Sequence, residues 1–95
     1  MSPEVSTRTV TVANQHGLHA RPCLAIRKTV GDFDAKVTVK FNGQTAGADS
    51  VLELLSLAVD QGDQLVLSAS GPQADEALDA LVRLFEEEFG VNYDD

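Results

Sequence analysis

Residues 35–43 read AKVTVKFNG, and this stretch indicates the kind of fold that the chain adopts. Small or apolar side chains occupy every second position up to Phe41, with polar ones between them, as expected of a strand with one buried face. Asn42-Gly43 comes next, and this pair is typical of a tight hairpin turn. We therefore predict a strand over residues 35–41 that returns as a short strand over residues 44–48.

Two further segments show the same alternation and are predicted as strands. One covers residues 8–12, and the other follows a turn at Gly62-Asp63. The apolar positions that share one face in these two strands are Val10, Val12, Leu65, Leu67 and Ala69.

Three segments carry apolar residues at helical spacing. The first runs from Ala20 to about Val30, and the second begins after Ser50, whose hydroxyl can cap it. Glu53 stands three residues after this serine, so a capping box is predicted. The apolar stripe of the third helix consists of Ala74, Ala77, Leu78, Leu81, Val82, Phe85 and Phe89.

The predicted order of elements is β-α-β-β-α-β-α, with short connections between them. Such an order favours an α+β fold, an open-faced β-sandwich in which three helices cover one face of a four-stranded antiparallel sheet. No linker, repeat or low-complexity segment divides the chain, so residues 1–95 are expected to form one domain. Residues 5–89 should be structured, with a short acidic tail after them.

Composition excludes several classes of function. The net charge of −8 argues against nucleic acid as a partner, because binding to nucleic acid needs a basic face. No apolar run approaches the length of a membrane span, and nothing near Met1 resembles a signal peptide, so no membrane insertion is expected. The single cysteine, Cys23, cannot form an internal disulfide, which favours a reducing cytoplasm. Its side chain is expected to pack in the core. The protein is expected to be a monomer.

Residues 17–22 read GLHARP, and this hexapeptide is the strongest functional signal in the chain. His19 stands where a helix is about to begin, and the free N–H groups and positive dipole of a helix start favour an anion. Arg21 adds a planar, permanently charged fork that suits phosphate oxygens, and Pro22 suits the first helical turn. The helix start should also lower the pKa of His19, which keeps the imidazole neutral and nucleophilic. The combination indicates a site that carries a phosphoryl group.

These residues resemble the signature of the HPr family, the histidine-containing phosphocarriers of the bacterial phosphotransferase system. Ser50 and Gly71-Pro72-Gln73 extend the resemblance to the second and last helices. It implies that Nδ1 of His19 accepts a phosphoryl group from phosphohistidine on enzyme I, ultimately from phosphoenolpyruvate. The group would pass to a downstream protein while Arg21 holds its oxygens, so the chain would be a carrier and not an enzyme with its own small substrate. No cofactor and no metal are expected, since the chain has neither a nucleotide-binding loop nor ligand spacing.

The resemblance also implies a docking surface for enzyme I and the acceptor. Leu54 and Leu57 are expected in the core, which leaves other leucines of the short second helix exposed. The residues expected in this docking surface are Ala20, Leu24, Lys28, Val51, Leu52 and Leu55.

Ser50 has two interpretations. Its role as a helix cap is a complete structural explanation, and the resemblance adds regulatory phosphorylation by a dedicated serine kinase. Asp49 and Glu53 would place negative charge on either side of such a phosphate, which disfavours regulation.

Two alternatives to a sugar-transport carrier stay open. Gly71-Pro72-Gln73 and the acidic balance point to the nitrogen-branch paralogue, which uses the same histidine chemistry. A binding module that docks without turning over phosphate is the other, and it is disfavoured by the presence of His19.

His16 lies three residues before His19, and we interpret it as an exposed loop histidine and not as a metal ligand or relay.

Overall fold

The computed structural model describes residues 5–90, and its elements follow the predicted order with one addition. The addition is a short 3-10 helix, η1, after the last α-helix. The elements are β1 (Ser6–Thr11), α1 (Ala20–Val30), β2 (Lys36–Phe41), β3 (Gln44–Gly47), α2 (Val51–Ser56), β4 (Gln64–Ser70), α3 (Ala74–Glu86) and η1 (Glu88–Gly90).

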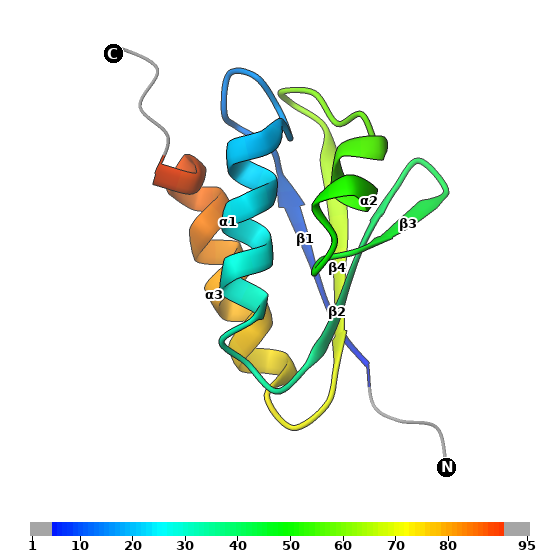
Figure 1. Cartoon of the computed structure of the whole chain (residues 1–95), viewed down its shortest axis with the longest axis vertical. Helices are drawn as coiled ribbons and strands as arrows, with labels where there is room; N and C mark the ends of the chain where they lie inside the picture. The colour runs from blue at the N-terminus through cyan, green and yellow to red at the C-terminus, as the bar shows by residue number, and fades with distance from the viewer. Residues whose placement is uncertain (1–4, 91–95) are drawn as a thin grey trace.

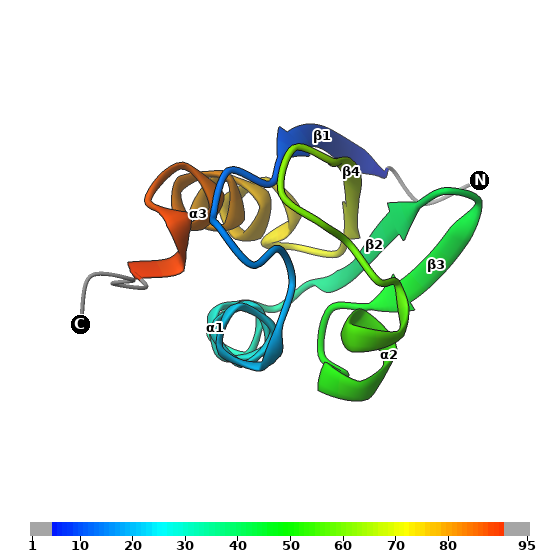
Figure 2. The ribbon, with the colours of Figure 1, turned by 90° about the horizontal axis from the view of Figure 1, so that it is seen from above.

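The four strands form one antiparallel sheet in the order β1-β4-β2-β3. The three α-helices lie on one side of this sheet, and none of the described residues forms a layer on its other face (Figures 1 and 2). The fold is therefore the predicted open-faced α+β sandwich. Among the described residues, no helix has both the length and the apolar character that a bilayer crossing needs.

The core lies between the sheet and the helices. The predicted alternation is confirmed in β2 and β4, where Val39, Leu65 and Leu67 are fully buried. The Asn42-Gly43 hairpin is also confirmed, since both residues have the positive φ angles, 53° and 80°, that a tight hairpin turn uses.

Some predicted boundaries were wrong. β1 covers Ser6–Thr11 and not residues 8–12, because Val12 leaves the strand ladder. Its N–H donates to Asp63 O (2.9 Å) and its carbonyl accepts from Gly62 N (2.7 Å), so Val12 closes the turn before β4.

The prediction that Phe89 continues the stripe of the last helix was also wrong. α3 ends at Glu86, and Phe89 has a φ of 61° inside η1. The reversal of the backbone still buries Phe89, whose ring packs edge-on against Phe85 with centroids 4.7 Å apart.

Gly71-Pro72-Gln73 ties the start of α3 to the loop before β2. Gln73 N donates to Asp34 O (3.0 Å), and Asp34 N donates to Gln73 Oε1 (2.7 Å). Gly71 has a φ of 113°, and a Cβ there would meet Asp34 O at 3.1 Å. Gly71-Pro72-Gln73 therefore has a structural role, and this role is independent of the protein's function.

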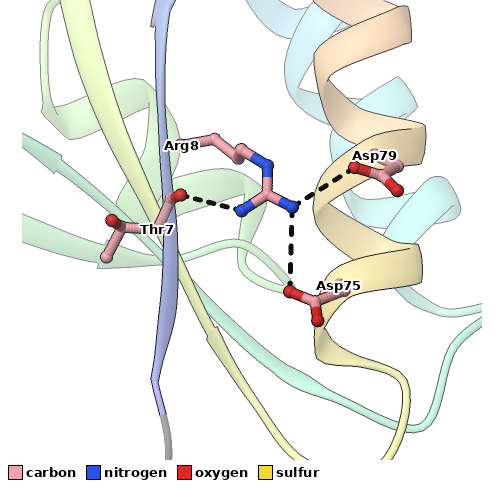
Figure 3. A network of polar contacts seen from close by, with 4 residues as sticks. All are labelled: Thr7, Arg8, Asp75 and Asp79. Atoms are coloured by element: carbon pink, nitrogen blue, oxygen red, sulfur yellow. Dashed lines mark hydrogen bonds and ion pairs between the residues drawn. The ribbon is translucent and has the colours of Figure 1, made fainter.

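Arg8 ties β1 to α3 on the helical side of the sheet (Figure 3). Its Nη2 lies 3.4 Å from Asp79 Oδ1 and 3.7 Å from Asp75 Oδ1, and its Nη1 donates to Thr7 O (2.9 Å). The two aspartates are about 70% exposed, so each pair contributes on the order of 0.2–1 kcal/mol to stability.

Candidate functional site

His19 occupies the N-cap position of α1, as the hexapeptide predicted. Its backbone is extended (φ −92°, ψ −171°), and its carbonyl accepts the first helical hydrogen bond from Cys23 N (3.2 Å). A helix leaves the N–H groups of its first turn without helical acceptors, and Pro22 has no N–H to leave. The amides of Ala20 and Arg21 are therefore the donors that α1 offers to an anion beside His19.

A buried asparagine holds the loop before His19. Asn14 is fully buried, and its Nδ2 donates to Gly17 O (2.6 Å), while Gly17 N donates back to Asn14 O (3.2 Å). Leu18 N donates to Val59 O (3.0 Å), which joins this loop to the segment after α2. Both loops lie at the same end of the molecule in Figure 1. No signal in the sequence indicated that Asn14 is buried, so its role was missed.

His16 lies beside His19, a pairing that its interpretation as an exposed loop histidine did not include. The two rings meet edge to face at 84°, with their centroids 5.8 Å apart. His16 is exposed, as predicted, whereas His19 is partly buried. Burial lowers the pKa of His19 most, and the nearby charges of His16 and Arg21 lower it further. The imidazole of His19 is thus kept neutral at neutral pH, which is the form a nucleophile needs.

Arg21 and Cys23 lie in the first turn of α1, one exposed to solvent and the other buried. Arg21 is exposed, so its guanidinium is free to meet a group that arrives from outside. Cys23 is fully buried, and burial raises the pKa of its thiol to about 11. Such a thiol is a poor nucleophile, so packing is its role, as predicted.

Across residues 5–90, no cluster of three His, Cys, Asp or Glu side chains has the geometry of a metal site.

Five of the six residues predicted for docking are exposed, and the sixth, Val51, is half-buried. α1 and α2 lie on the same side of the sheet and contact each other (Figure 2). Leu24 is 53% exposed and Leu52 80%, while Leu55 is 37% exposed and Val51 is half-buried. Ala20 and Lys28 are exposed as well, whereas Leu54 and Leu57 are buried as predicted.

Ser50 is the N-cap of α2, as predicted, and its Oγ accepts from Glu53 N (3.3 Å). The return half of the predicted capping box is replaced by another contact. Glu53 Oε1 accepts from Gly47 N (3.0 Å) on β3, while Ser50 N donates to Gly47 O (3.1 Å). Glu53 therefore ties α2 to the sheet edge and does not close the helix on itself.

A groove of about 590 Å³ lies beside the C-terminal half of α1, between Arg27, Gly31, Lys36 and Asp49. Neither His19 nor Arg21 lines it. The histidine is instead presented on the surface at the start of α1, where another protein can reach it.

The comparisons with known proteins agree with this geometry. Residues 6–87 match the family described as the PTS HPr component phosphorylation site. The chain is 40% identical to phosphocarrier protein HPr of Vibrio cholerae over 78 residues, 82% of this chain and 92% of that one. It is also 40% identical to phosphocarrier protein NPr of Escherichia coli over 83 residues, 86% of this chain and 92% of that one.

A solved structure of an HPr protein from Thermoanaerobacter tengcongensis has the same fold. Its TM-score is 0.87 at 36% sequence identity, with 92% of this chain and 98% of that chain covered. The sequence match, the fold and the position of the histidine agree, and the chain belongs to the HPr family of phosphocarriers of the phosphotransferase system.

Proposed function

We propose that this protein carries a phosphoryl group on Nδ1 of His19, accepting it from phosphohistidine on enzyme I and passing it to a downstream protein. The observation that carries this proposal is the environment of His19. Its pKa is lowered, it caps the start of α1, and Arg21 is close enough to act on it electrostatically. A neutral imidazole beside free amides and a guanidinium is suited to accept a phosphoryl group and to hold its oxygens.

The transfer balances without a cofactor. The lone pair on Nδ1 of neutral His19 attacks the phosphorus, and the bond between phosphorus and the donor nitrogen breaks. The donor ring, protonated on its other nitrogen, leaves as neutral imidazole, while the ring of His19 keeps its Nε2 proton. Arg21 and the first-turn amides of α1 stabilise the negative charge on the phosphoryl oxygens during this step.

The exposed leucines beside this site supply the docking surface of the proposal. Leu24 and Lys28 are exposed on α1, Leu52 and Leu55 are exposed on α2, and the two helices contact each other. Apolar anchors with a charged rim are typical of a transient protein interface. Enzyme I and the acceptor would use this surface in turn.

The test of this proposal uses phosphoenolpyruvate, enzyme I and intact-mass measurement. The wild-type protein should gain one acid-labile phosphoryl group, and His19→Ala should gain none. Arg21→Ala should still be labelled, but about 10- to 1000-fold more slowly, because it loses charge stabilisation in the transition state. Equal labelling of His19→Ala would overturn the assignment, and a wild-type rate for Arg21→Ala would remove that residue from the mechanism.

A further inference from the structure

His16 stands in a turn that fixes its position beside His19. The turn is closed by the backbone bond from Gly17 N to Asn14 O (3.2 Å) and by the bond from Asn14 Nδ2 to Gly17 O (2.6 Å). Gln15 and His16 are the two central residues of this turn. The backbone that carries His16 is therefore held by two hydrogen bonds, and its ring lies 5.8 Å from that of His19.

We propose that His16 is a second phosphate-binding residue of this site, and that its protonated ring pairs with the phosphoryl oxygens on His19. The inference rests on the proposed function of His19 and adds a group to it. The two rings meet edge to face, with their centroids 5.8 Å apart. A phosphoryl group on His19 would bring its oxygens within the reach of a donor on His16.

A positive charge on His16 would repel a charge on His19 before phosphoryl transfer and attract the phosphoryl group after it. Before transfer, a positive charge on His16 disfavours a second positive charge on His19 and so helps to keep the nucleophile neutral. After transfer, the phosphoryl group carries negative charge, and the same cation attracts it. His16 would therefore assist both the attack and the holding of the product.

Histidine is the side chain whose charge changes between pH 5 and pH 8, so this assistance depends on pH. The other charged groups near this loop differ in sign. Arg21 lies on α1 and stays positive, while Asp60 and Asp63 lie in the segment packed against the loop. Asp63 Oδ2 already accepts from Asp60 N (2.9 Å), and Glu88 lies on η1, which contacts α1. Histidine is the only residue type in this group whose ordinary pKa lies near neutral pH.

The first test is an NMR titration of the His19 ring, and it needs no phosphate. In His16→Gln the pKa of His19 should rise, because a neighbouring positive charge is gone. In His16→Arg the pKa of His19 should stay low, because the positive charge is kept. Gln15→Ala changes the neighbouring turn residue without changing charge and should match the wild type. An unchanged pKa of His19 in His16→Gln would overturn the inference, whatever the phosphorylation assay shows.

The second test measures phosphorylation by phosphoramidate, which needs no partner protein. The bond between Nδ1 and phosphorus forms, and the protonated amine of the reagent leaves as ammonia. At pH 6, His16→Gln should react roughly two- to tenfold more slowly than the wild type, and the two should converge above pH 8. His16→Arg should lose this pH dependence.

The outcomes of the second test separate the two proposals. If phosphoramidate labels no protein at His19, the proposed function fails, and the titration still decides whether His16 acts on His19. If His19 is labelled but the ratio of His16→Gln to wild type is the same at pH 6 and above pH 8, His16 does not bind the phosphoryl group. Gln15→Ala should follow the wild type at every pH.

Discussion

At the scale of single residues, the placement of His19 depends on Gly17. Gly17 has a φ of 64°, which is unfavourable for residues with a Cβ. It is also buried against the segment after α2, where an added Cβ would collide with Val59 O and lie 2.8 Å from the Cα of Asp60. Gly17 thus allows the loop before the nucleophile to touch a segment far along the chain.

Gly17→Ala should therefore destabilise the protein more than an ordinary turn glycine does. Gly43→Ala is the matched control, since Gly43 also has a positive φ (80°) and its added Cβ would meet nothing within 4 Å. We expect the control to cost about 1 kcal/mol, and Gly17→Ala to cost about 1–3 kcal/mol more because backbone atoms must move. Urea unfolding of both variants measures the difference, and equal costs would mean that the contact with Val59 does not constrain the loop.

The residues that were predicted and those that were missed differ in where their contacts lie. His19, Arg21 and Pro22 could be assigned because a helix start is a local feature with a local sequence signal. Asn14 and His16 could not, because a polar residue in a polar loop is usually solvated. The burial of Asn14 and the pairing of His16 with His19 exist only once the loop has folded against the segment that contains Val59.

At the scale of elements, α2 is a helix of only six residues that depends on its neighbours. A helix this short has little intrinsic stability, so its contacts decide whether it forms. Leu54 anchors it in the core, Ser50 caps it, and Glu53 joins it to β3 through Gly47 N. The sequence predicted the first two contacts, and it assigned Glu53 to the wrong backbone amide.

The charge of Glu53 should influence which enzyme I the protein accepts. Asp49 and Glu53 put negative charge beside the exposed leucines of α2, and charges at the rim of an interface mainly set association rates. We expect wild-type protein to be a poor acceptor from an enzyme I of a sugar-transport system. Glu53→Lys should accept faster from that enzyme, with the largest gain at low salt, where charges are least screened.

Glu53→Gln is the control for this effect, because it removes the charge and keeps the Oε1 acceptor for Gly47 N. It should give a smaller gain in rate with little change in stability. Glu53→Lys should lose about 1 kcal/mol, since Gly47 N loses its acceptor. Identical acceptance by wild type and both variants across salt concentrations would show that this charge does not select partners.

At the scale of the whole molecule, one continuous core joins the sheet to all three α-helices. Sequence patterns predicted which elements form and which faces they bury, since both depend on local periodicity. They gave no strand order, because β4 inserts between β1 and β2 and pairs with residues far away in the chain. Cys23 lies within this core, so its thiol reports on the molecule as a whole.

The buried thiol should make stability fall at alkaline pH. The pKa of Cys23 rises from an ordinary value of 9.0 to about 11, so the folded state holds the proton more tightly than the unfolded state. The free energy of unfolding keeps the full contribution of the protonated thiol below pH 9. As the pH rises toward 11, it falls by about 1 kcal/mol at pH 10 and by up to about 3 kcal/mol in full. Urea unfolding between pH 8 and pH 10.5 should show a steeper loss for wild type than for Cys23→Ala. Every other ionisable group is the same in the two proteins, so parallel pH profiles would mean that Cys23 ionises in the folded protein without cost.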